Sequence, residues 1–175
     1  NVQVRHAKMR PATEIRPVGL LARRCGTVMN LADYAVARPA IADDLPPVIA
    51  VVGSSMNAGK TTSAAGIIHG LTRAGLRVGA AKLTGTGSGG DLWTMRDAGA
   101  VTALDFTDAG HASTYLLDLP ALEAITTTLL AQMARPQHDM IVVEIADGLL
   151  QRETAMLLQA ARRHGWFQSV MFAAG

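Results

Sequence analysis

The stretch AVVGSSMNAGKTT, Ala50–Thr62, decides the fold of this chain. It overlaps the apolar run VIAVV, which is typical of a strand buried on both faces, and it leads into TTSAAGIIHGLTRAG, which has helical character. Gly53, Gly59, Lys60 and Thr61 follow the pattern G-x-x-x-x-G-K-[ST], with one extra residue between the two glycines. A strand before the pattern and a helix after it are the context that a phosphate-binding loop requires.

Such a loop binds phosphate because its backbone N–H groups converge on the anion and the positive end of the following helix adds to them. We expect Lys60 to reach the β- and γ-phosphates of a nucleotide, and the Thr61 hydroxyl to ligate Mg²⁺. The alternative is a plain glycine-containing turn, but few such turns carry G-K-T-T directly after a buried strand. The residues predicted to bind nucleotide are Gly53, Ser54, Ser55, Met56, Asn57, Ala58, Gly59, Lys60, Thr61 and Thr62.

Strand-like and helix-like segments alternate through the rest of the chain. LRVGAAK, VTALDF, MIVVEIA and the final SVMFAA are strand candidates, and DLWTMRDAGA, LPALEAITTTLLAQMA and QRETAMLLQAARRHG are helix candidates. This alternation predicts an α/β fold, in which helices flank a parallel sheet in three layers. We expect that domain to cover residues 46–175. Trp93, in the second predicted helix, is expected either in the core, which is favoured, or as a wall against the ligand.

Residues 1–45 differ from the rest of the chain. EIRPVGLLARR and GTVMNLADYAV resemble short strands on either side of Cys25-Gly26, which predicts a small β-rich element, and RPAIADDLPP is a predicted linker. The chain begins at Asn1 without a methionine and ends on VMFAAG, which is typical of a strand. We therefore expect a piece of a longer polypeptide, truncated at its C-terminal end.

The composition excludes several classes of protein. Of the 175 residues, 49% are hydrophobic and 17% charged, which favours a packed core over disorder. The formal net charge is only +2 and no run of lysine or arginine stands out, so we expect no nucleic-acid partner. Cys25 is the single cysteine and no apolar stretch reaches the ~18 residues of a membrane span, which favours a cytoplasmic protein without membrane contact.

Charged residues lie at the ends of two predicted strands. Glu144 stands near the end of MIVVEIADG, where an unpaired carboxylate would be costly unless it helped to orient Mg²⁺. Lys82 ends LRVGAAK and there needs an anion or water. Asp91 is a candidate N-cap for the helix that begins after it. Asp147 either positions water or occupies a turn.

The lengthened loop resembles that of dethiobiotin synthetase, a P-loop NTPase whose loop reads G-T-D-T-D-V-G-K-T. The two glycines, the lysine and the threonine align without a gap, whereas Ser55 and Asn57 stand where that family has aspartates. The segment GGDLWTMRDAGA is also similar to a D-x-x-x-x-R-x-A-G-A-like run of the molybdopterin-guanine-dinucleotide accessory GTP-binding protein. The resemblance covers residues 48–175.

The resemblance implies roles for particular residues. Glu144 matches the glutamate of V-V-E-G-A-G-G in dethiobiotin synthetase, and Lys82 matches the lysine of its K-P-V-x-S-G segment, without the proline. Asp91 lies in the region where that enzyme has a magnesium-holding aspartate. The implied catalytic residues are therefore Lys60, Lys82 and Glu144, and the implied Mg²⁺ site consists of Thr61, Asp91 and Glu144.

Two hypotheses follow for the function. In the first, the chain is a Mg²⁺- and ATP-dependent enzyme that hydrolyses the nucleotide or moves its γ-phosphoryl group to a small carboxylate, carbamate or similar oxyanion. In the second, it is a GTP- or ATP-dependent accessory protein that controls a partner enzyme. A substrate-sized polar cavity beside Lys82 would favour the first, and a symmetric homodimer with the loop at a partner surface the second. No [NT]-K-x-D motif for guanine is found, so ATP is preferred and GTP stays open.

The segment DFTDAGHASTYLL carries Asp105, Asp108 and His111, which suggest a metal site at first sight. Their spacing is irregular, and we expect only a loop beside the ligand.

Overall fold

The structure is a computed structural model that describes residues 14–38, 45–133 and 137–175. The chain separates into two compact units, Asn1–Asn30 and Leu31–Gly175. In the described part of the first unit, a turn brings Ala22 and Val28 into an isolated antiparallel bridge. This bridge stands in place of the two short strands that we expected. Most of the predicted linker lies outside the described residues, and the boundary at residue 45 stays a prediction.

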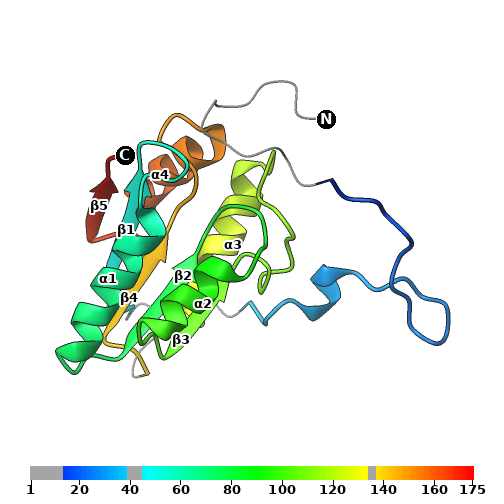
Figure 1. The fold of residues 1–175 in the computed structure, drawn as a ribbon, viewed down its shortest axis with the longest axis horizontal. Helices are drawn as coiled ribbons and strands as arrows, with labels where there is room; N and C mark the ends of the chain where they lie inside the picture. The colour runs from blue at the N-terminus through cyan, green and yellow to red at the C-terminus, as the bar shows by residue number, and fades with distance from the viewer. Residues whose placement is uncertain (1–13, 39–44, 134–136) are drawn as a thin grey trace. The chain divides into compact units, whose positions relative to one another are not determined.

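The second unit is built on one five-stranded parallel sheet (Figure 1). The strands are β1 (Val48–Gly53), β2 (Val78–Lys82), β3 (Thr102–Asp105), β4 (Met140–Glu144) and β5 (Ser169–Ala173). Their order across the sheet is β3-β2-β4-β1-β5. β1 and β4 are apolar and buried, as expected for strands covered on both faces.

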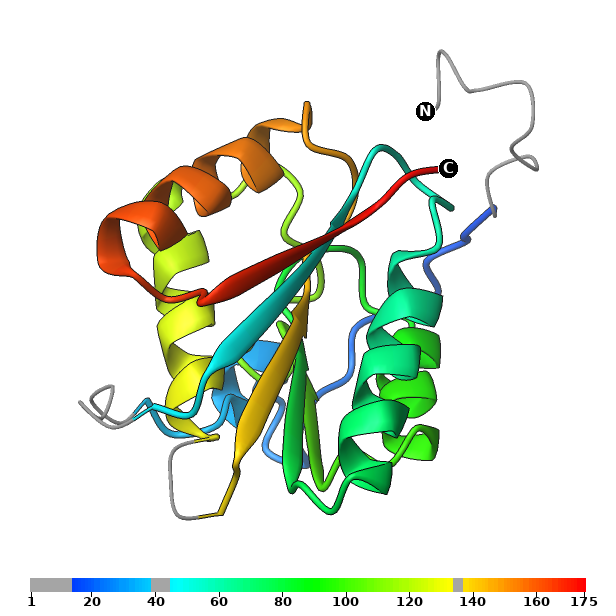
Figure 2. The ribbon, with the colours of Figure 1, turned by 90° about the vertical axis from the view of Figure 1, so that its left-hand side faces the viewer.

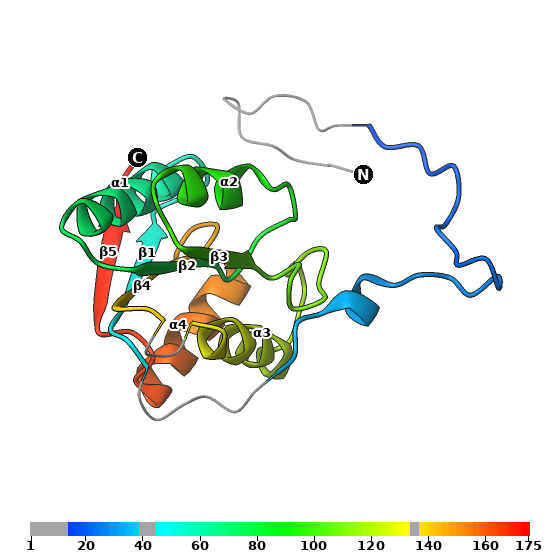
Figure 3. The same cartoon turned by 90° about the horizontal axis from the view of Figure 1, so that it is seen from below.

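Four helices cover the two faces of the sheet. They are α1 (Lys60–Arg73), α2 (Gly90–Asp97), α3 (Leu119–Ala131) and α4 (Arg152–His164), and a short 3₁₀ helix, η1, spans Leu31–Tyr34. Figures 2 and 3 show α1 and α2 on one face and α3 and α4 on the other. The predicted three-layer α/β fold is confirmed. Among the helices of the described residues, none has the length and apolar character needed to cross a bilayer.

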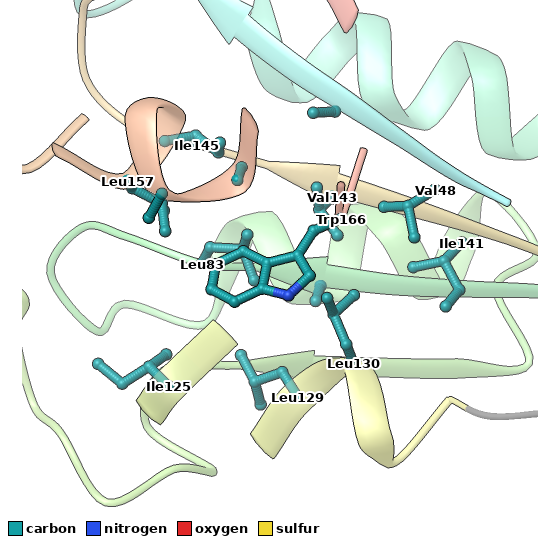
Figure 4. Packing of buried hydrophobic residues seen from close by; sticks show 14 of the residues in the cluster. Val48, Leu83, Ile125, Leu129, Leu130, Ile141, Val143, Ile145, Leu157 and Trp166 are labelled. Atoms are coloured by element: carbon teal, nitrogen blue, oxygen red, sulfur yellow. The ribbon is translucent and has the colours of Figure 1, made fainter. Parts of the chain in front are cut away.

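The core is divided by the sheet into two apolar clusters. Under α3 and α4, Trp166 packs among Leu83, Leu129 and Leu130 (Figure 4). This packing follows from the apolar stripe of α3, where residues three and four positions apart share one helix face.

Trp93 does not join the core on the opposite face, so that prediction is wrong. α2 buries Met95 completely, and Trp93, two positions earlier, is 62% exposed. Residues two positions apart in a helix point to different sides, so burying Met95 turns Trp93 toward solvent.

Candidate functional site

The predicted phosphate-binding loop connects β1 to α1. α1 begins at Lys60, and its N-cap Gly59 has φ +90°, a left-handed conformation that glycine adopts without strain. Gly53 is required for a different reason, because the Lys60 side chain runs back over it. A methyl group added at Gly53 would lie 2.8 Å from Lys60 Cγ. The loop pattern therefore places its first glycine and its lysine in direct contact.

Neighbouring segments hold this loop on both sides. The Ser54 N–H donates to the carbonyl of Ala173 at the end of β5, and the Leu149 N–H donates to the carbonyl of Gly53. Gly148 lies so close that a methyl group there would be 2.5 Å from the Ser54 carbonyl oxygen. The shape of the loop therefore depends on β5 and on the segment after β4, as well as on its own sequence.

The candidate magnesium ligands meet at the carboxyl ends of the central strands. Thr61 Oγ1 lies 2.9 Å from Glu144 Oε1 and 3.2 Å from Asp91 Oδ1, within hydrogen-bonding distance of both carboxylates. Lys82, paired in register with Glu144 on the neighbouring strand, forms an ion pair with Asp91. Four charged or hydroxyl side chains from four segments of the chain are thus brought together.

Glu144 shows why a cation fits here. Its side chain is buried, with the residue only 2% exposed, and Oε2 is the one buried side-chain oxygen or nitrogen of the described residues without a hydrogen-bond partner. A buried carboxylate oxygen in that state is costly, and a cation would offset the cost. The described residues contain no group of three or more His, Cys, Asp or Glu side chains able to hold a metal. The oxygen donors of Thr61, Asp91 and Glu144 are of the kind that suits Mg²⁺, which keeps waters and takes phosphate oxygens as further ligands.

A cavity of about 360 Å³ opens in front of these side chains. Of the residues predicted to bind nucleotide, Met56, Asn57, Gly59, Lys60, Thr61 and Thr62 line it, together with Lys82, Asp91 and Glu144. The other predicted loop residues do not. Gly53 is covered by the side chain of Lys60. Ser54 and Ala58 lie close to Gly175. The carbonyl oxygen of Ser55 accepts a 2.8 Å hydrogen bond from Lys60 Nζ.

Lys60 is only 6% exposed. Burial is the main cause that lowers the pKa of its ammonium group. The negative charges of Glu144 and Asp147 raise this pKa in part, and the positive charge of Lys82 lowers it further. A buried ammonium group favours an anion beside it, because the anion stabilises the charged form. The phosphates of a nucleotide are such anions.

A second cavity of about 300 Å³ adjoins the first and shares Met56, Lys82, Ala146 and Asp147 with it. The sequence interpretation missed Gln151 and Glu153, which line it from the start of α4. An acidic residue in the first turn of a helix is usually explained by the helix dipole, so the sequence carried no distinct signal for Glu153. The glycine-rich segment after β2 contributes Thr84, Gly85 and Thr86 to the wall.

Two expectations outside the loop need correction. α2 begins at Gly90 with Gly89 as its N-cap, so Asp91 is not the cap but lies in the first turn, where it contacts Lys82 and Thr61. The segment that carries Asp105 and Asp108 reaches the second cavity through Ser113, Thr114 and Tyr115, whereas the two aspartates make hydrogen bonds within their own turn and line neither of the two cavities, so for them alone the expected place beside the ligand is not observed.

Comparison with known proteins bears on the fold alone. No protein-family model matches the chain, and no curated protein matches it. Among solved structures, it is similar to the signal recognition particle receptor FtsY of Elizabethkingia anophelis, with 16% identity, a TM-score of 0.51, and 82% of this chain and 46% of that chain covered. It is also similar to the cell division protein ftsY of Thermotoga maritima, with 15% identity, a TM-score of 0.50, and 82% and 49% covered. The chain thus spans about half the length of these two structures. With its five-stranded parallel sheet flanked by helices, it has the fold of the P-loop NTPases.

Proposed function

We propose that this chain is a Mg²⁺-dependent nucleotide-binding enzyme, with ATP as its preferred nucleotide. One observation carries the proposal: Thr61, Asp91, Glu144 and Lys82 converge beside the buried Lys60, and Glu144 Oε2 lacks a partner. A structural role alone does not account for a buried carboxylate that keeps one oxygen without a partner next to two lysines and a hydroxyl group. The similarity to the P-loop NTPase fold also supports nucleotide binding.

In this proposal each residue has a defined task. Lys60 exchanges the Ser55 carbonyl for the β- and γ-phosphate oxygens, and the backbone N–H groups at the start of α1 bind the phosphates. Thr61, Glu144 and Asp91 would hold Mg²⁺ directly or through its waters, and the ion would supply positive charge beside the phosphates.

The second cavity favours transfer to a small acceptor over simple hydrolysis. It lies beside Lys82 and has the size expected of a substrate site, and although more of its exposed surface is apolar than polar, Thr84, Thr86, Thr114, Gln151 and Glu153 place polar side chains in its wall. A carboxylate or carbamate oxygen of the acceptor attacks the γ-phosphorus, and a new O–P bond forms. The bond from the phosphorus to the β,γ-bridging oxygen breaks, and ADP departs with the electron pair. Because the attacking oxygen carries no proton, this step needs no general base.

The test is calorimetric titration of ATP and of GTP, with and without Mg²⁺, against the wild type and Lys60→Ala. We expect Mg²⁺-dependent binding of ATP by the wild type, tighter than that of GTP, and its loss in Lys60→Ala. Arg73→Ala is the matched control, since it removes an exposed cation from the other end of α1 and should bind like the wild type. No nucleotide binding by the folded wild type would refute the proposal. Tighter binding of GTP, with a homodimer and no stimulation by acceptors, would replace it with the accessory-protein alternative.

A further inference from the structure

We propose that the second cavity binds a small zwitterion, an amino-acid-like molecule with its carboxylate at Lys82 and its ammonium group at Glu153. This inference rests on the proposed function and names the class of acceptor. The cavity, at about 300 Å³, is at the lower end of the size range of small-molecule sites. Its size therefore suits a small molecule.

Three charged residues line the second cavity: Lys82, Asp147 and Glu153. Lys82 lies at the border with the nucleotide cavity and lines both, so an acceptor carboxylate bound there would be next to the γ-phosphate. Glu153 lines the second cavity only. A molecule that satisfies both residues must carry a negative group toward the nucleotide and a positive group away from it.

Glu153 is a buried carboxylate whose charge is only partly compensated. It is 3% exposed, and its Oε1 accepts a 2.7 Å hydrogen bond from the Leu116 N–H. Arg152 approaches to 3.8 Å, but its own side chain is 55% exposed, so water screens most of that attraction. An ammonium group inside the cavity would be shielded from water, and its charge-assisted hydrogen bond to Glu153 would be correspondingly strong.

The hydroxyl groups deep in the wall are already engaged. Thr84 donates to the Ala146 carbonyl at 2.6 Å, and Thr114 Oγ1 accepts from the Gly85 N–H at 2.9 Å. These groups shape the cavity and have little capacity left to select a ligand. Asp147, like Lys82, also lines the nucleotide cavity, so the charge that belongs to the second cavity alone is that of Glu153, and selection is assigned to Lys82 and Glu153.

Lys82 also couples the two cavities. Its ammonium group is paired with Asp91, which in the proposed function turns to Mg²⁺. A bound Mg²⁺–nucleotide complex would free Lys82 for the acceptor carboxylate. The zwitterion is thus expected to bind more tightly after the nucleotide than before it.

The experiment uses the whole chain saturated with Mg²⁺ and a non-hydrolysable ATP analogue, with nucleotide binding confirmed by calorimetry for each variant. Glycine, β-alanine and γ-aminobutyrate are the zwitterionic probes, and butyrate and butylamine carry one charge each. Dissociation constants are measured by ligand-observed NMR. We expect at least one zwitterion to bind ten times or more tighter than both singly charged probes, and tighter with the analogue than without it.

Two variants report on the cavity. Glu153→Gln should weaken zwitterion binding at least tenfold, whereas Glu123→Gln, the same change on α3 beside Arg163 and His164, should not alter it. Thr86→Trp, at an exposed position of the cavity wall, should block zwitterion binding and leave nucleotide binding unchanged, and it covers the case in which Glu153→Gln does not fold.

The inference is overturned if butyrate binds as tightly as γ-aminobutyrate, if folded Glu153→Gln binds zwitterions like the wild type, or if no probe binds while the nucleotide does. The last result would leave the proposed function intact. Absence of nucleotide binding would instead refute the proposed function and the inference together.

Discussion

Gly53→Ala tests the contact between the first loop glycine and Lys60. The added methyl group would lie 2.8 Å from Lys60 Cγ and 3.0 Å from Cδ, whereas ordinary contacts begin at 3.4 Å, so the lysine stem must move by roughly 0.6 Å or more. The methyl cannot move away, because the Ala173 carbonyl oxygen lies 3.2 Å from it on another side. Overpacking of this kind costs about 1–3 kcal/mol of unfolding free energy.

The same displacement should weaken nucleotide binding. A hydrogen bond between an ammonium group and a phosphate contributes about 1.5–3 kcal/mol, so losing its geometry corresponds to a tenfold to hundredfold rise in the Kd for Mg²⁺–ATP. Urea denaturation measures the first effect and calorimetric titration the second.

Gly66→Ala is the control for this prediction. Gly66 lies within α1 with no neighbouring atom within 4 Å of an added methyl group, so alanine there should stabilise the helix by about 1 kcal/mol and leave nucleotide binding unchanged. If Gly53→Ala binds Mg²⁺–ATP like the wild type and is equally stable, the proposed contact with Lys60 does not constrain the site.

Three further predictions concern the site and the core. Glu144→Gln should lower the Mg²⁺-dependent part of ATP affinity by about tenfold to a hundredfold, measured by titration with Mg²⁺ and with EDTA, since it removes the buried carboxylate charge. Burial lowers the pKa of Lys60 below its ordinary 10.5, so the unfolded chain holds this proton at pH values where the folded chain has lost it. The unfolding free energy of the ligand-free protein should therefore rise as the pH is raised toward 10.5. Lys60→Met should lack this contribution to the rise, and urea denaturation of both proteins at several pH values measures the difference. Leu129→Ala, at a fully buried position under Trp166, should reduce the unfolding free energy by about 2–5 kcal/mol in urea denaturation while the Kd for ATP stays the same.

Most of the fold was predicted from local patterns in the amino-acid sequence. The loop at Gly53, the buried run of β4 and the stripe of α3 are local periodicities, and each is confirmed as a strand, turn or helix. Lys82 and Glu144 were each placed at the end of a predicted strand, and the structure pairs them in register because parallel strands place their carboxyl ends at one edge of the sheet.

Features that depend on distant contacts were not predictable in this way. Glu153 lines a cavity only because β2 and the loop before α3 bring Lys82 and Leu116 near the start of α4. Trp93 was assigned to the core from its residue type, but its exposure is decided by which face of α2 meets α1 and the sheet. Nothing in the sequence near either residue records those contacts.

The strand order has a consequence for how the chain folds during synthesis. β1 carries the loop glycine, yet its partners β4 and β5 lie far along the chain, and Val48 pairs with Ile141, roughly 90 residues later, which a ribosome adds in about 5–20 seconds. Until then β1 has no neighbour on either side, and its apolar run is exposed to solvent and to chaperones. The predicted phosphate-binding loop, although continuous in sequence, is therefore expected to be among the last parts of this domain to take its final shape.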